Sequence, residues 1–192
     1  MNTELHEFVR QETVRNFGEP SHSMRFQGPE EPNPFSPFPP FLDIYVWKPD
    51  ANSDLTTFGT NGISQRPLTG HEFRGEVHFA IQGKINAELE KQLGEFLANL
   101  ALFPFSNKTS FDWWSSFGLS GVIPGFKTCN AIVLHPPFHE QGWAQMHWDE
   151  FDIKILNAVP ITSEEHTIIT SKSIPALQDF WGDKQINIFK QR

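Results

Sequence analysis

The clearest pattern of hydrophobic and polar positions in this chain lies between residues 87 and 101. Apolar side chains recur there at helical spacing, at Leu89, Leu93, Phe96, Leu97 and Leu100. Asn86 can cap the first turn, and Pro104 follows shortly after the last apolar position. The pattern predicts an amphipathic helix over 87–101 that ends before Pro104.

Three more helices are expected. Residues 4–17 show helical spacing and are followed by Gly18, a plausible helix stop. Thr162 and Glu165 have the spacing of a capping box, which predicts a helix start. A last helix is expected to begin near Pro175.

Strand signals are alternating or continuous runs of apolar and β-branched residues. They occur at residues 43–48, 55–60, 76–82, 129–134 and 151–159, with a possible short strand in 119–123. Asn61-Gly62 is a turn signal after the second run. Residues 138–150 are predicted to form a loop, and residues 186–189 a short strand or helix turn.

The predicted strands come in runs and do not alternate strictly with helices. This order favours an α+β fold of α/β type, with helices packed on a central mixed, largely antiparallel sheet. At 192 residues, the chain fits a single domain. We expect a helix and a Pro-rich lead-in over 1–41 (the Pro-rich part being 29–41) and a core over 42–192.

The formal net charge of −8 argues against nucleic acid and anionic membranes as partners. It suits a basic protein partner, although acidity also serves solubility. One cysteine, Cys129, excludes an intramolecular disulfide. The N-terminal segment does not resemble a signal peptide, and no apolar window is long enough to span a membrane, so the cytoplasm is expected.

Catalytic and cofactor motifs are absent from the sequence. Neither a phosphate-binding loop nor a GxSxG motif occurs, and Cys129 lies in an apolar run where a thiol is inert. One set of polar residues is of the types that bind metal ions: His135, His139, His147, Asp149 and Glu150. His135 and His139 flank two prolines and cannot share a helix face, so we expect no metal, no cofactor and no enzyme activity.

Aromatic residues offer a different kind of site. Four tryptophans lie in segments predicted to be loops, where they either anchor an interface or cover the core. If an interface exists, the residues expected to bind a partner are Trp113, Trp114, Trp143, His147, Trp148, Asp149 and Glu150.

Several segments together resemble bacterial suppressor-of-fused domain proteins. The segments are DIYVWKPDANSDLTTFGTNGISQRPL (43–68), EVHFAIQ (76–82), the 87–103 helix, AIVLHPP (131–137) and ILNAVPITSEEHTII (155–169). Leu68 stands where the family often has Met, and the stretch 29–41 has no counterpart that we can identify. The ordered set spans residues 40–182.

The resemblance implies an α/β domain with a central sheet. Animal members of the family are two-domain regulators that hold transcription factors of the Hedgehog pathway, whereas bacterial single-domain members look like immunity proteins of polymorphic toxin systems. We therefore expect a non-catalytic protein-binding domain, most simply an immunity protein that covers a toxin domain, such as a basic one. The alternatives are a regulatory scaffold that accepts a peptide strand at a sheet edge, and a metal-dependent enzyme that uses His135, His139, His147 and Asp149.

Overall fold

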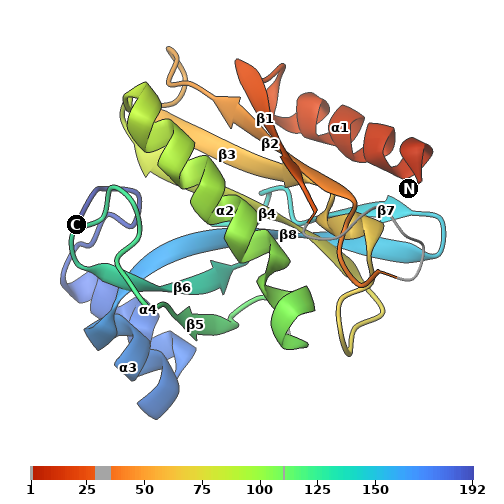
Figure 1. The fold of residues 1–192 in the computed structure, drawn as a ribbon. Coiled ribbons are helices and arrows are strands. Elements are labelled where there is room, and N and C mark those ends of the chain that lie inside the picture. Colours follow the sequence, from red (N-terminus) through yellow and green to blue (C-terminus); the bar gives the residue numbers. More distant parts are fainter. Residues whose placement is uncertain (1, 29–35, 110) are drawn as a thin grey trace.

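The computed structural model describes residues 2–28, 36–109 and 111–192, and these ranges form one large sheet with helices on both faces (Figure 1). The strands are β1 (His22–Gln27), β2 (Phe41–Trp47), β3 (Leu55–Asn61), β4 (Arg74–Gln82), β5 (Ser116–Gly118), β6 (Cys129–His135), β7 (Gln145–Trp148) and β8 (Phe151–Thr162). The helices are α1 (Thr3–Phe17), η1 (Ile63–Gln65, a 3-10 turn), α2 (Ala87–Asn107), α3 (Ser163–Ser171) and α4 (Ile174–Asp183).

The strand order is β1-β2-β3-β4-β8-β6-β5, with β7 also paired to β8. The pair β4–β8 is parallel and the other pairs are antiparallel. The sheet is therefore mixed and largely antiparallel, which confirms the predicted fold class.

The long strand β8 is paired with β4 along one edge and with two strands along the other. On that second edge β7 pairs with residues 151–154, and β6 pairs with residues 157–162. Residues 136–144 leave the sheet between these two strands, and Ala144 returns to accept a hydrogen bond from the Ile155 N–H. The excursion of 136–144 is the irregularity around which the candidate site is built.

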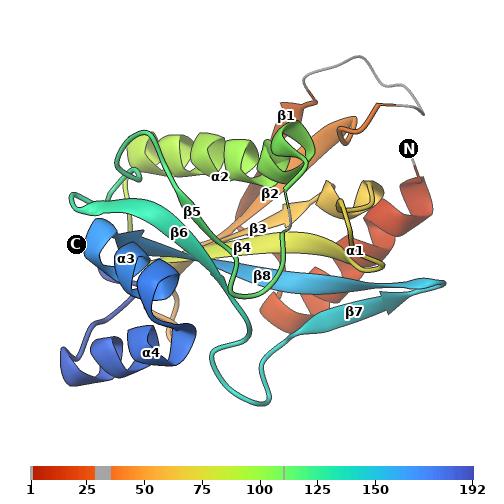
Figure 2. The same ribbon diagram turned by 90° about the horizontal axis from the view of Figure 1, so that it is seen from below.

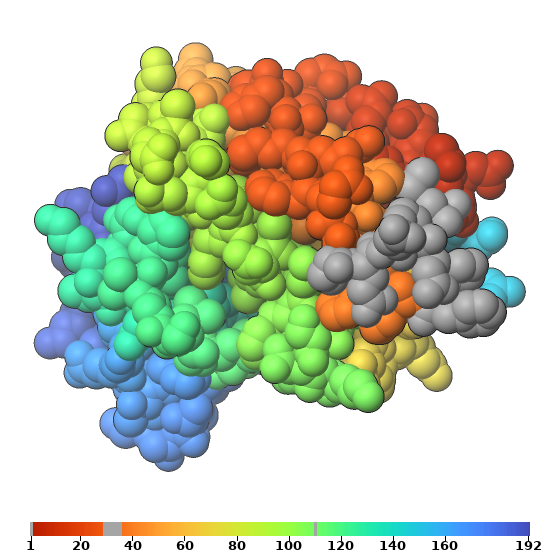
Figure 3. Space-filling model, in the orientation of Figure 1, coloured from red at the N-terminus to blue at the C-terminus, as the bar shows by residue number. Residues whose placement is uncertain are grey.

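One face of the sheet is covered by α2, which crosses β2, β3 and β4 (Figures 1 and 2). Its apolar stripe packs on a core that includes Ile44, Phe58 and Val77. Gly94 lets β1 approach the helix, because a Cβ there would lie 2.4 Å from Cε of Met24. In the space-filling view from this side, α2 and the segment after β5 lie over the middle of the sheet, and the residues of β1 remain visible beside α2 (Figure 3).

The opposite face is covered at its two ends. At one end, Leu5 and Val9 of α1 pack on Met146, Ile153 and Ile155. At the other end, α3 and α4 cover the strands β6 and β8. Figure 2 shows both groups of helices on the side of the sheet opposite α2, with the loop that joins β6 and β7 between them.

All four predicted helices are present, but α2 is longer than expected. It continues through Pro104 to Asn107, so the prediction that Pro104 lies past its end is wrong. Proline lacks the N–H for a helical hydrogen bond. Because Pro104 and Phe105 are both buried, we infer that their packing offsets the missing bond.

Two strand predictions around the edges of the sheet are also wrong. The strand expected in residues 119–123 is absent, since the strand is β5 just before it and Val122 is 63% exposed. Residues 145–148, expected to lie in a loop, form β7 and pair with β8. The short strands β5 and β7 are set by their pairing with β6 and β8, and local polarity did not reveal this pairing.

Other differences are smaller. The strand β1 was not predicted, Asn61-Gly62 leads into η1 and forms no tight hairpin, and residues 186–189 form neither a strand nor a helix. Residues 29–35 of the Pro-rich segment lie outside the described ranges, and β2 begins at Phe41. The capping box is present, since Thr162 and Glu165 exchange side-chain to backbone hydrogen bonds.

Candidate functional site

The histidines and acids of the possible metal set are spread out in the structure. His135 is buried and contacts its neighbour's carbonyl, with 2.6 Å between His135 Nδ1 and Pro136 O, and burial lowers its pKa. His139 is exposed, and His147 faces Asp152 across the β7–β8 pair at 2.9 Å. Within the described ranges, no group of three His, Cys, Asp or Glu side chains is placed to hold a metal ion.

Two fully buried carboxylates have structural partners. Glu76 accepts hydrogen bonds from Gly62 N, from the backbone and hydroxyl of Ser64 and from Thr60 Oγ1. Glu165 accepts from Trp181 Nε1 at 2.8 Å and from Arg192 Nη1 at 2.6 Å. Because these bonds occupy the carboxylate oxygens, neither acid is free for acid–base chemistry.

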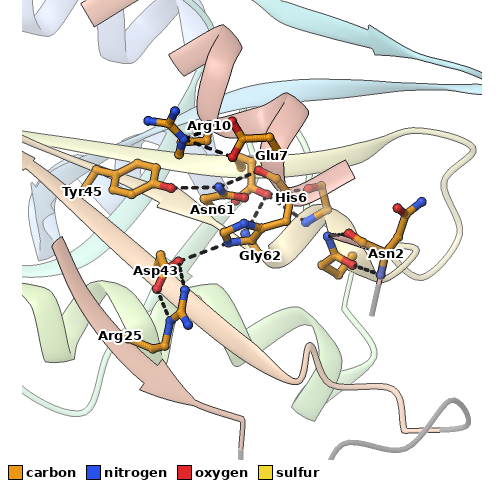
Figure 4. Close-up of polar contacts among 12 residues, drawn as sticks. Asn2, His6, Glu7, Arg10, Arg25, Asp43, Tyr45, Asn61 and Gly62 are labelled. Atoms are coloured by element: carbon orange, nitrogen blue, oxygen red, sulfur yellow. Dashed lines mark hydrogen bonds and ion pairs between the residues drawn. The ribbon is translucent and has the colours of Figure 1, made fainter. Parts of the chain in front are cut away.

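A third acid, Asp43, belongs to a polar network that fastens α1 to the sheet (Figure 4). Arg25 donates to both of its oxygens at 2.7 Å, and His6 Nε2 lies 3.1 Å from Oδ2. Burial alone would raise the pKa of Asp43, but the hydrogen bonds from Arg25 and His6 outweigh it and hold the pKa at about 2. Asn61 adds bonds to the His6 carbonyl and to Tyr45.

The first two candidate tryptophans have internal contacts. The Trp113 indole N–H donates to Ile155 O at 2.9 Å, in the gap that β6 and β7 leave along β8, and Lys154 lies over its ring. Trp114 packs edge-on against His135, with ring centroids 4.5 Å apart. Both rings are half-buried. Their contacts lie with the sheet and not with the other candidates.

The remaining candidates are gathered on and beside the β7–β8 hairpin: Trp143, His147, Trp148, Asp149 and Glu150. Trp148 is half-buried against Phe8 of α1, with ring centroids 4.9 Å apart. Asp149 and Glu150 form the exposed turn, and Asp149 has the left-handed φ of 43° that Asp tolerates better than most residues. The structure thus brings five of the seven predicted residues to one end of the sheet.

Together with α1, this hairpin forms an open groove of about 410 Å³. It is lined by Thr3, Glu4, Glu7, Phe8, Gln11 and Trp148, and the hairpin turn with Asp149 and Glu150 continues from Trp148. We name these eight residues the acidic groove. Glu4 and Glu7 line the groove beside its two aromatic rings, Glu7 is paired with Arg10, and Asp149 and Glu150 follow Trp148 directly in the chain.

A second depression, the aromatic pocket, lies on the same face of the sheet, and its volume is about 270 Å³. Its walls are Phe17 at the end of α1, Pro137, Phe138, His139, Gly142 and Trp143 of the β6–β7 loop, and Phe189 near the C-terminus. Its floor is Leu55, Thr57, His78, Phe79, Ala80, Ile155, Asn157 and Ala158. Phe17 and Phe138 are 41% and 43% exposed, and they are two of the three exposed large hydrophobic residues in the described chain.

His78 is the most unusual residue of the pocket. It is only 3% exposed, and burial lowers its pKa to about 4, so the imidazole is neutral at pH 7. Its ring contacts Phe17 and Trp143, at centroid distances of 5.1 and 5.5 Å, and no hydrogen bond joins it to any described residue.

Phe17, His78 and Phe189, which line the pocket, were not among the candidates predicted from the sequence. Phe17 was placed at the end of a helix and His78 inside a strand, and neither position carries a local signal of a site. The one available hint was that His78 is a polar residue within an apolar strand. It lies on the face of the strand opposite to Val77, Phe79 and Ile81.

This combination of a mixed eight-stranded sheet, a long helix on one face and open depressions on the other defines the class as an α+β domain of the suppressor-of-fused type. The chain belongs to the suppressor of fused (SUFU) family, whose model matches residues 39–192. The resemblance found in the sequence is thereby confirmed. A comparison with curated protein sequences finds no match.

Solved structures share the fold at low sequence identity. A SUFU homologue from Neisseria gonorrhoeae FA 1090 has a TM-score of 0.67 and 12% identity, and the match covers 97% of this chain and 93% of that one. A Sufu–Fu complex has a TM-score of 0.60 and 10% identity, and the match covers 92% of this chain and 82% of that one. Drosophila Suppressor of Fused has a TM-score of 0.61 and 11% identity, and the match covers 91% of this chain but only 45% of the Drosophila chain.

No helix in the described ranges is both long enough and apolar enough to cross a membrane.

Proposed function

We propose that this chain is a non-catalytic protein-binding domain that acts in the cytoplasm as an immunity protein, neutralising the toxin of a bacterial polymorphic toxin system. The observation that carries the proposal is the acidic groove. Its carboxylates attract a basic surface, and the rings of Phe8 and Trp148 provide apolar area at its centre.

Several further features support this proposal. The net charge of −8 speeds encounter with a basic partner such as a nuclease domain. A protein that works by covering a toxin needs no catalytic group of its own, and the buried carboxylates Glu76 and Glu165 are engaged in structural bonds. The Sufu–Fu complex shows that a protein of this fold forms a complex with another protein.

The test is co-expression with the toxin encoded beside the gene, together with a binding measurement on the purified pair. We expect the double variant Glu4→Lys and Glu150→Lys to slow association about tenfold at low salt, with a smaller effect at high salt. Trp148→Ala is expected to weaken binding by about 2 kcal/mol or more, as for a central aromatic anchor.

The matched control is Asp179→Lys with Asp183→Lys, on exposed positions of α4 away from the groove. Each reversal adds two charges, so both double variants change the net charge from −8 to −4. If the two double variants slow association equally, only net charge matters and the acidic groove is not the interface. If no protection and no complex are found, the immunity role is refuted.

A second candidate function is a scaffold that accepts an extended peptide at a sheet edge. The strand β1 ends the sheet on one side, so its outer backbone groups have no partner strand in the sheet. Ser23→Pro would remove a backbone N–H from this strand. Peptide binding that is lost in Ser23→Pro and kept in Trp148→Ala would favour the scaffold.

A further inference from the structure

We infer that the aromatic pocket binds the side chain of a tyrosine presented by the partner protein. This inference deepens the proposed function and rests on it, since it assumes that the partner is a protein. It concerns a different surface from the acidic groove, so the two can be tested separately.

The walls of the pocket select a flat ring. Phe17, Phe138, Trp143 and Phe189 surround a space of about 270 Å³, which is below the usual range for drug-sized ligands and suits a single side chain. Aromatic rings gain additional energy from edge-to-face contacts with other rings. None of the residues that line the pocket is Asp, Glu, Lys or Arg, so a charged group entering it would lose its hydration without a counter-charge.

The floor of the pocket selects a hydroxyl group. His78 and Asn157 are direct neighbours on the paired strands β4 and β8, and both line the pocket. The Asn157 amide N–H groups donate to the carbonyls of His135 and Pro136, which leaves Oδ1 without a partner among the described residues.

The imidazole of His78 likewise has no hydrogen-bond partner among the described residues. A Cβ on Gly59 would lie 3.1 Å from its Nε2 and 3.2 Å from its Cδ2, so this edge of the ring faces β3. The opposite edge, with Nδ1, lies on the side away from β3, which is the side on which β8 pairs with β4. A neutral imidazole carries one N–H donor and one acceptor, and a polar atom without a protein partner is free to bond to a ligand. A phenol hydroxyl can both donate and accept between these two side chains.

The rim of the pocket indicates that the ring belongs to a polypeptide. Phe17 and Phe138 line the pocket and are 41% and 43% exposed, so its mouth is open to solvent between two apolar side chains. The residues beside a partner's tyrosine would cover both. A second copy of this chain cannot supply the ring, because its single tyrosine, Tyr45, is 6% exposed and lies in the network around Asp43.

The pocket can be tested without the partner. We would titrate the full ¹⁵N-labelled chain with N-acetyl-tyrosinamide and, separately, N-acetyl-phenylalaninamide, and follow backbone amide signals by NMR. We expect shifts confined to the segments that line the pocket, which are the end of α1, β3, β4, the 137–143 loop, β8 around Asn157 and the residues around Phe189. The tyrosine amide should bind roughly three- to tenfold more tightly, which is the value of one hydrogen bond. Equal affinities would overturn the assignment to tyrosine, and shifts elsewhere would overturn the site.

Three variants sharpen this test. His78→Leu should abolish the preference for the tyrosine amide while the ring still binds. Ala80→Leu should fill the pocket and abolish binding of both amides, and Phe138→Ser serves as a second weakening variant should Ala80→Leu not fold. Val122→Ser, which changes the third exposed apolar residue, should leave both affinities unchanged.

The same variants separate this inference from the proposed function. With the partner, Ala80→Leu should weaken the complex at least tenfold independently of the charge reversals in the acidic groove. If Ala80→Leu blocks the tyrosine amide yet leaves the complex intact, the partner does not use the pocket although the protein-binding function stands. A dimer of the chain alone that Ala80→Leu dissociates in sedimentation would overturn the assignment in favour of a second copy.

Discussion

Replacing Asp43 by Asn should lower the stability of the protein in a way that depends on pH. Asp43 is 5% exposed and carries a bidentate ion pair with Arg25, and His6 lies close to the same oxygens (Figure 4). The carboxylate therefore holds α1 and β1 to β2 by charge as well as by shape.

The size of the effect follows from the pKa of Asp43, which is 3.8 in the unfolded reference and about 2 in the folded protein. A difference of nearly two pKa units corresponds to at most about 2.4 kcal/mol. Because the Arg25 side chain is 54% exposed, solvent screens the pair, and we expect a loss of about 1–2 kcal/mol at pH 7.

The sign of the pH dependence is fixed by the same numbers. The folded pKa lies below the unfolded one, so the stabilisation is fully present above about pH 5 and is lost as the pH falls towards 2. Urea unfolding followed by tryptophan fluorescence at several pH values between 2.5 and 7 measures it. The difference between wild type and Asp43→Asn should shrink steadily as the pH falls.

The control is Asp179→Asn on α4, an exposed acid that forms no ion pair with the described residues. Its effect should be small at every pH. The reasoning is refuted if Asp43→Asn costs the same at pH 2.5 as at pH 7, or if Asp179→Asn shows the same pH dependence.

Three other predictions concern buried positions. Gly62→Ala should destabilise the protein by about 2 kcal/mol or more in urea unfolding, because φ is 147° there and a Cβ would lie 2.6 Å from Phe41 O; an unchanged midpoint would contradict this. Glu165→Ala should cost about 3–5 kcal/mol, since it leaves Trp181 and Arg192 without their acceptor, and Glu165→Gln should cost less. Cys129 is buried and burial raises its pKa, so a disulfide reagent should label it only on unfolding; rapid labelling of the native protein would be inconsistent with its position.

Local sequence patterns predicted those elements whose own residues carry the reason for their structure. The stripe on α2, the capping box of Thr162 and Glu165, and the apolar runs of β6 and β8 were all found where expected. Each depends on neighbours a few residues away. The position of Pro104 led to a wrong prediction only of where α2 ends, because the burial of Pro104 depends on tertiary packing.

The edges of the sheet could not be predicted in the same way. Both β1 and β7 are short and polar on alternate positions, and they exist because β2 and β8 provide hydrogen-bonding partners. His147 and Trp148 were therefore recognised as candidates, but in a loop. Their place on a strand facing α1 follows from pairing with Phe151 and Asp152.

By itself, the sequence determined the class of fold, the acidity and most of the helices and strands, because these follow from composition and short-range periodicity. The family followed from the resemblance of an ordered set of segments. Only the tertiary structure decided where surfaces form. The acidic groove joins Phe8 to Trp148, and the aromatic pocket joins Phe17, His78, Trp143 and Phe189, from four separate parts of the chain. Such contacts depend on how α1, the 136–144 excursion and the C-terminal segment cover one face of the sheet, and no local pattern encodes that arrangement.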